Sequence, residues 1–170
     1  MTAKKAPSGK RRHRPSAAKE ERADFSRETD AVRYIETSAL LAALLEQDAA
    51  AIRALASDGR YVTSSLTFAE ANRAIVRART LFRMTPATEA ATIAALRRVR
   101  RRCTILPVSD AVLTRAGRPF PVEPIRTLDA LHLATLEMVA DPPQLTTIIT
   151  RDKRIRANAK ALGYVLTGSG

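Results

Sequence analysis

The chain has 170 residues, which is enough for one compact domain with a hydrophobic core. Its 29 Lys and Arg residues outnumber its 17 Asp and Glu residues, and the net charge of +12 indicates an acidic partner, nucleic acid before an acidic protein. The single cysteine, Cys103, excludes an internal disulfide and is typical of a reducing compartment, so we expect a cytoplasmic protein. No apolar run approaches the roughly 18 residues of a membrane span, and we expect no contact with a membrane.

Residues 1–30 are polar, contain two prolines and one glycine, and have no hydrophobic period. Such a segment cannot bury enough apolar surface to offset the entropy of ordering, so we predict a basic disordered tail followed by one folded domain at residues 31–170. Residues 31–170 hold 20 basic and 12 acidic side chains, so the predicted domain is itself basic. The run Lys10–Arg14 could be a solvated leader, which we favour, or a contact to RNA.

From residue 31, short β-branched runs alternate with helical segments, which predicts an α/β domain with a parallel sheet. The predicted strands are 32–36, 60–64, 104–108, 144–150 and 164–166. The predicted helices are 39–45, 48–58, 67–80, 85–102, a short helix after Ser109 and Asp110, 127–138 and 152–162. Thr37 and Ser38 are the expected cap of the first helix.

The segment Arg126–Met138 organises the chain, because it is apolar nearly all round and predicts a helix buried against the sheet. Thr127 can cap this helix, and Asp129 lies in its first turn, where the helix dipole favours an anion. Taken alone, Asp129 is more typical of a helix-start stabiliser than of a catalyst. His132, one turn later, is more often structural than a ligand.

Four acids fall where predicted strands end or the following helices begin, and they are Glu36, Glu70, Asp129 and Asp152. Ligands of open parallel sheets bind beyond the carboxyl ends of the strands. Three of these acids also have structural interpretations: a solvated strand end for Glu36, a capping box with Thr67 for Glu70, and an N-cap for Asp152. Carboxylates crowded at one edge nevertheless repel one another unless they share a proton or a cation. An oxygen-only cluster suits Mg2+ or Mn2+.

Four motifs in this order carry a family resemblance: Tyr34–Leu40 (YIETSAL), Ser65–Ala71 (SLTFAEA), Arg126–Ala134 (RTLDALHLA) and Thr150–Ile155 (TRDKRI). The chain resembles the PIN domain over about residues 32–167, and in particular the VapC-type ribonuclease toxins of bacterial toxin–antitoxin pairs. This resemblance implies a three-layer α/β/α sandwich, often dimeric, that hydrolyses RNA with Mg2+ or Mn2+ and is blocked by an antitoxin protein.

The resemblance also implies roles for individual side chains. The four acids are the expected catalytic residues, with Glu36, Asp129 and Asp152 as metal ligands and Glu70 orienting or deprotonating water. The hydroxyl groups that match the family's supporting residues are those of Thr37, Ser38 and Thr150.

Basic residues must balance the charge of an RNA substrate. Arg73 and Arg77 follow Glu70 at i+3 and i+7 on the same helix face, where they can reach RNA phosphates. The dense run Arg97–Arg102 has two open interpretations, a solvated helix end or a contact to RNA or an antitoxin. With 7 aromatic residues and no Trp, the sequence favours recognition of shape and phosphates over base stacking.

One position departs from the family pattern, because Glu36 stands where the family has Asp. The extra methylene moves the carboxylate by about 1 Å, and a misplacement of that size can lower a rate about 100-fold. The alternative hypothesis is therefore a catalytically weakened PIN-like domain that binds RNA or an antitoxin. A third and weaker hypothesis is a Mg2+-dependent phosphotransfer receiver. It is weaker because the first predicted strand ends in one acidic residue and not in a pair of acidic residues.

Overall fold

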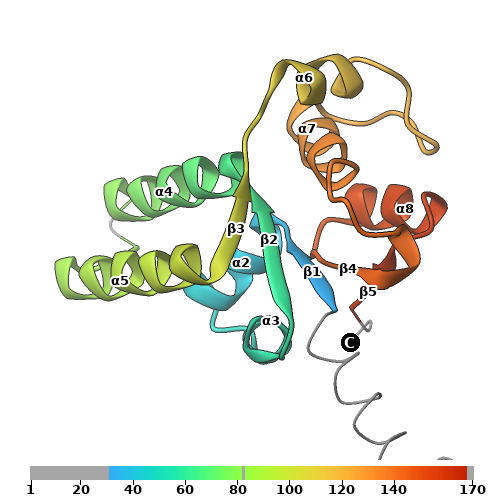
Figure 1. The fold of residues 1–170 in the computed structure, drawn as a ribbon. Coiled ribbons are helices and arrows are strands. Elements are labelled where there is room, and N and C mark those ends of the chain that lie inside the picture. The colour runs from blue at the N-terminus through green and yellow to red at the C-terminus, as the bar shows by residue number, and fades with distance from the viewer. Residues whose placement is uncertain (1–30, 82, 168–170) are drawn as a thin grey trace, which may run out of the picture.

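The computed structural model describes residues 31–81 and 83–167 (Figure 1). Its sheet has five parallel strands in the order β3–β2–β1–β4–β5 within this described part of the chain. The strands are β1 (Val32–Ile35), β2 (Arg60–Ser64), β3 (Cys103–Leu106), β4 (Thr146–Ile149) and β5 (Val165–Leu166). The tail predicted at residues 1–30 lies outside the described residues.

Helices fill the connections between the parallel strands, as such connections require. They are α2 (Thr37–Leu45), α3 (Ala49–Ala56), α4 (Ser65–Thr80), α5 (Pro86–Arg102), α6 (Asp110–Ala116), α7 (Thr127–Leu136) and α8 (Lys153–Ala161), with a 3-10 turn η1 (Pro143–Leu145) before β4. Figure 1 shows α4 and α5 side by side on one side of the sheet and α7 with α8 on the other. The predicted α/β class and three-layer arrangement are confirmed.

The alternation of side chains along β1 divides the hydrophobic core in two. Val32 and Tyr34 pack with residues of α6, α7 and α8, such as Leu133 and Ile155. Ile35 faces the other way and packs with α2, α4 and α5. Because successive side chains of a strand point to opposite faces, one four-residue strand anchors both helical layers. Within the described residues, no helix combines the length and apolarity needed to cross a bilayer.

Two helix starts differ from the sequence prediction. Thr37 and Ser38 lie inside α2, and Glu36 is the N-cap, because its backbone is still extended (φ −97°, ψ 154°) and its carboxylate accepts a hydrogen bond from the Ser38 N–H. Thr127 is already the first residue of α7, whose N-cap, Arg126, makes no side-chain capping bond. An acidic or basic side chain therefore stands at each start where a hydroxyl was expected.

The second strand runs directly into α4, which moves Glu70 away from the helix start. Ser64 caps α4 and Ser65 is its first residue, so Glu70 lies in the second turn and not in the first. Thr67 is inside the helix and fully buried, where its hydroxyl accepts from Thr63 at 2.8 Å. The capping-box interpretation of Glu70 is therefore wrong.

Two strand boundaries also shift. Strand β3 begins at Cys103 and ends at Leu106, before Pro107, because proline cannot donate to a ladder. Pro143 places η1 where the start of the fourth strand was predicted, so β4 is limited to Thr146–Ile149. Burial raises the pKa of the Cys103 thiol to about 11, and Cys103 packs as a partly buried residue against the core.

The arginine run at the end of α5 has a packing role that the sequence did not suggest. The Arg100 guanidinium lies 4.9 Å from the centroid of the Phe68 ring, and that of Arg102 lies 5.1 Å from the Tyr61 ring. Both distances are in the range of cation–π contacts. These two arginines therefore cover aromatic side chains of the α4–α5 layer.

Gly59 allows the chain to enter β2. Its φ of +131° is rarely adopted by other residues, and a Cβ there would lie 2.6 Å from the Ala31 carbonyl oxygen. We predict that Gly59→Ala lowers the free energy of unfolding by about 1–3 kcal/mol in urea titrations. Gly117→Ala is the matched control, because a Cβ there meets its nearest atom at 3.6 Å, and it should leave stability unchanged or raise it by up to about 1 kcal/mol. Equal effects of the two changes would contradict this account.

Candidate active site

The carboxyl ends of β1 and β4 form the topological switch point of the sheet. These strands are neighbours, with Ile35 beside Ile149, although the chain leaves β1 toward β2 on the other side. Open parallel sheets bind ligands in the crevice at such a point. Glu36 follows β1 directly, and Asp152 lies three residues beyond the end of β4.

The Glu36 carboxylate is buried, with 4% of the residue exposed, and both of its oxygens accept hydrogen bonds. The Ser38 N–H donates to Oε1 at 3.0 Å, and the Thr150 hydroxyl donates to Oε2 at 2.7 Å. The Ser38 hydroxyl also donates to Oε2. The longer Glu side chain therefore turns back onto the start of α2, where these three donors compensate for its burial.

Ser38 links the end of β1 to the loop after β4. Its hydroxyl oxygen accepts from the backbone N–H groups of Arg151, at 2.8 Å, and Asp152, at 3.1 Å. The Thr150 hydroxyl accepts from the same Asp152 N–H at 3.1 Å. Two of the predicted supporting hydroxyls thus hold Glu36 and the backbone of Asp152 in one network.

Asp152 itself caps α8. Its Oδ1 accepts from the N–H groups of Arg154, at 2.7 Å, and Ile155, at 3.0 Å. A capping bond of this kind stabilises the helix and fixes the orientation of the carboxylate. The N-cap interpretation of Asp152 is correct, and it leaves the position of this acid beside the switch point unchanged.

Asp129 is a half-buried acid in the first turn of α7, and its Oδ2 is buried without a hydrogen-bond partner among the described residues. Burial and, next, the charge of Asp152 raise the pKa of the Asp129 carboxyl. Arg126 and Arg154 act in the opposite direction. The Asp129 carboxylate therefore has one buried oxygen without a donor from the described residues and interacts with the charge of Asp152, and both features are typical of a carboxylate that can bind a cation.

Glu70 belongs to a second cluster, formed where α2, α4 and α7 meet. Its Oε2 lies 2.7 Å from Nε2 of His132, and it accepts a hydrogen bond from the Thr37 hydroxyl. Burial acts to raise the pKa of Glu70, but the hydrogen bonds from His132 and Thr37 outweigh this and hold it below its ordinary value. Glu70 is therefore a carboxylate at neutral pH.

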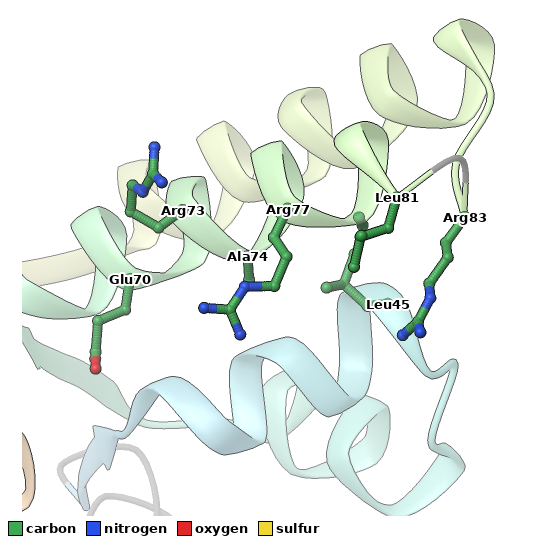
Figure 2. A pocket seen from close by; sticks show the side chains of 8 residues that line it. Leu45, Glu70, Arg73, Ala74, Arg77, Leu81 and Arg83 are labelled. Atoms are coloured by element: carbon green, nitrogen blue, oxygen red, sulfur yellow. The ribbon is translucent and has the colours of Figure 1, made fainter.

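A groove of about 400 Å³ extends from Glu70 between α2 and α4. Its lining includes both predicted RNA contacts, Arg73 and Arg77, and also Arg83, with apolar residues such as Leu45 between them. Figure 2 shows Glu70 and Arg77 pointing from α4 toward α2, whereas Arg73 turns away from it. Of the two predicted arginines, Arg77 is the better placed to hold a phosphate beside Glu70.

The four acids are not arranged as a complete metal-binding site in the described part of the chain. Across residues 31–81 and 83–167, no group of three or more His, Cys, Asp or Glu side chains is arranged to hold a metal ion. The carboxylate oxygens nevertheless suit a hard cation. Asp129 has a buried oxygen without a hydrogen-bond partner among the described residues, and the charge of Asp152 raises its pKa further. The assignment of Glu36, Asp129 and Asp152 as ligands stays a prediction.

Sequence reasoning missed three neighbours of these acids. His132 was expected to be structural, yet it contacts the Glu70 carboxylate, and a signal was present in its position one turn after Asp129. Arg126 and Arg154 lower the pKa of Asp129. The sequence signal was their spacing, because Arg126 lies three residues before Asp129 and Arg154 lies two residues after Asp152. All three flank predicted site acids in the sequence.

The chain belongs to the PIN domain family, whose model, "PIN domain", matches residues 33–161. Among curated proteins it is similar to Ribonuclease VapC35 of Mycobacterium tuberculosis, from strains CDC 1551 / Oshkosh and ATCC 25618 / H37Rv. Each match is 33% identical over 141 residues and covers 81% of this chain and 96% of the relative. The predicted family is confirmed.

A solved structure agrees with the fold. The crystal structure of VapBC2 from Rickettsia felis, bound to a DNA fragment from their promoter, contains a chain that matches with a TM-score of 0.54. The match covers 80% of this chain and 97% of that chain at 13% identity. At this identity the likeness concerns the fold alone.

The unpaired oxygen of Asp129 leads to a stability prediction. The raised pKa means that the folded protein keeps this proton to higher pH than the unfolded chain, so stability is lost as the pH rises through the folded pKa. Asp129→Asn should therefore raise the free energy of unfolding of the metal-free protein at pH 7, and this gain should shrink as the pH falls below the pKa.

Urea titrations from pH 3.5 to 8 would measure this dependence. Asp110→Asn is the matched control, because Asp110 is an exposed acid in the first turn of α6 and its replacement should slightly destabilise that helix. If the metal-free wild type is more stable than Asp129→Asn at pH 7, then the ionised Asp129 carboxylate does not destabilise the fold, and this prediction is wrong.

Proposed function

We propose that this protein is a metal-dependent endoribonuclease, the toxin of a toxin–antitoxin pair, that hydrolyses RNA phosphodiesters at the carboxyl edge of its sheet. The observation that supports the proposal is the buried, unpartnered oxygen of Asp129, whose pKa is raised by burial and by the charge of Asp152, in a chain of the PIN family. The 33% identity to Ribonuclease VapC35 supports RNA as the substrate.

The cation is a divalent metal, which we take to be Mg2+ or Mn2+ because the donors are all oxygens. Asp129 and Asp152 would hold it, together with Glu36. When bound, it supplies a Lewis acid that polarises a phosphate oxygen and lowers the pKa of water. It would also offset the burial and the charge of Asp152 that together raise the pKa of Asp129.

The chain's own residues orient the reactants. Glu70 is ionised at neutral pH, so it can accept a proton from the attacking water or fix that water by a hydrogen bond. The Ser38 and Thr150 hydroxyls donate to the Glu36 carboxylate and accept from the backbone N–H of Asp152, so they can hold these two residues at neighbouring strand ends. Arg77, with Arg73 and Arg83, can bind phosphates along the groove that begins at Glu70.

The partner we propose besides RNA is an antitoxin protein. The matched solved structure is named as VapBC2, from Rickettsia felis, which supports a partner of this kind. We further propose a homodimer that acts in the cytoplasm, where its RNA substrates lie, and sedimentation of the purified chain would test the dimer.

Glu36 is the residue on which the enzyme hypothesis is tested. In the structure its carboxylate is bound by Ser38 and Thr150, so a shorter side chain would withdraw from part of this network. If Glu36 only stretches the first ligand position, Glu36→Asp should raise Mn2+-dependent RNA cleavage by about 10- to 100-fold, the scale of an Å-level misplacement. Glu36→Gln should remove the activity, and so should a chelator.

Cleavage of single-stranded and structured RNAs would be followed on gels, with Asp129→Asn as the inactive reference. A wild type that cleaves well and a Glu36→Asp that cleaves worse would mean that the site is built around the longer side chain. If wild type, Glu36→Asp and Asp129→Asn are all inert, the enzyme hypothesis is abandoned, and the weakened RNA- or antitoxin-binding domain takes its place.

The groove arginines give a separate prediction. Arg77→Gln should weaken binding of a non-cleavable RNA about equally for all sequences, and it should reduce the slope of log K against log salt by about 0.7, the value expected for one phosphate contact to a single strand. Arg53→Gln is the control, because Arg53 is exposed on α3 and does not line the groove. Equal salt slopes for the two variants would contradict the hypothesis that RNA binds in this groove.

A further inference from the structure

His132 is a buried histidine. Its side chain is not part of the apolar core, and it is not among the expected metal ligands. Its residue is 2% exposed, although it lies among the apolar residues of α7. Nε2 lies 2.7 Å from Glu70 Oε2 and 3.1 Å from the Thr37 hydroxyl. Nδ1 is buried and has no hydrogen-bond partner within the described part of the chain. A residue selected for stability alone would not leave a buried nitrogen unsatisfied.

The backbone of His132 also makes a buried hydrogen bond. The Tyr34 hydroxyl, fully buried at the centre of the sheet, donates to the His132 carbonyl oxygen at 3.2 Å. This bond ties α7 at His132 to the centre of the sheet. Glu70 is the more exposed member of the pair, and it lines the groove.

Both contacts to Glu70 go to the same carboxylate oxygen. His132 and Thr37 meet at Oε2, and among the described residues no hydrogen bond to Oε1 accompanies them. A carboxylate held by one oxygen from two directions has a fixed plane, and its second oxygen has a fixed direction. That second oxygen is the one available to water or substrate in the groove.

We propose that His132 is a positioning residue: with Thr37 it fixes Oε2 of Glu70, so that Oε1 alone meets the attacking water. This inference rests on the proposed ribonuclease function, which assigns Glu70 to water. It gives His132 no proton transfer of its own. Nε2 must carry a hydrogen to donate to Glu70, and in the neutral ring Nδ1 is then an acceptor, for which the described residues offer no donor.

The first experiment needs no enzymatic activity. The full chain has two histidines, His13 and His132, so the side-chain signals of a 15N-histidine-labelled sample are readily assigned with a His13→Gln variant. We expect His132 to carry a proton on Nε2 that exchanges slowly with water, and we expect Glu70→Ala to accelerate that exchange. A bare Nε2, or an exchange rate that Glu70→Ala leaves unchanged, would overturn the proposal.

The second experiment separates positioning from stability. His132→Leu should lower kcat about 10- to 100-fold and change KM for RNA less than about threefold, as for loss of a supporting contact to a reacting group. His132→Gln, whose amide N–H can reach Oε2, should recover part of this loss. Thr135→Val is the control, because Thr135 is equally buried on α7 and bonds Ser64, not Glu70, and it should leave kcat unchanged.

A Glu70→Gln background completes the test. There, His132→Leu should cause no further loss of kcat, because the carboxylate that it positions is gone. A loss that adds to that of Glu70→Gln, or equal losses in His132→Leu and His132→Gln, would contradict positioning. A wild type without RNA cleavage would defeat the proposed function instead, and the exchange measurement would then decide on the His132–Glu70 contact alone.

Discussion

Burial of carboxylates at one edge of the sheet, to which the charge of Asp152 adds repulsion at Asp129, is the constraint on which the rest of the site depends. Parallel strands bring the ends of β1 and β4 together, and acids follow both ends. Each acid is compensated differently: Glu36 by hydroxyl and backbone donors, Asp152 by the start of α8, and Glu70 by His132 and Thr37. Asp129 is the acid whose compensation is incomplete, and its raised pKa is the result.

This arrangement explains why hydroxyl residues are concentrated beside the acids. A buried carboxylate requires donors that bring no second charge, because lysines or arginines at the same positions would compete with a cation for it. Ser38 serves two purposes, since its hydroxyl donates to Glu36 and accepts from the backbone of the loop after β4. Arg73, Arg77 and Arg83 line the groove between α2 and α4, where they can meet phosphates. Arg126 and Arg154, by contrast, act on Asp129 and partly offset the rise of its pKa.

The sequence predicted the fold class, every strand and the sheet edge that holds the acids, because those features follow from hydrophobic periodicity and from the rule that parallel strands share one carboxyl edge. It failed at the starts of α2, α4 and α7. Glu36 caps α2 although Thr37 and Ser38 are better capping residues by type, because local hydrogen bonds from Ser38 and a tertiary one from Thr150 hold its carboxylate there. The tertiary bond joins residues 114 positions apart, which local preference does not reveal.

The contact between His132 and Glu70 was also beyond sequence reasoning, since it depends on how α7 packs against α4 across the end of the sheet. The groove residue Arg83 lies after the end of α4, and no periodicity relates it to Arg77. Packing decides such pairings, whereas the sequence pattern decides only which face each helix presents.

The proposed site requires that the acids at the switch point share one divalent cation. Crystals soaked in Mn2+ and measured at the manganese absorption edge would reveal such an ion. One anomalous peak is expected within about 2.0–2.3 Å of carboxylate oxygens of Asp129 and Asp152, with Glu36 as a direct or water-mediated ligand. Crystals saturated with Mn2+ that show no peak beside Asp129, with its Oδ2 still unpartnered, would contradict it.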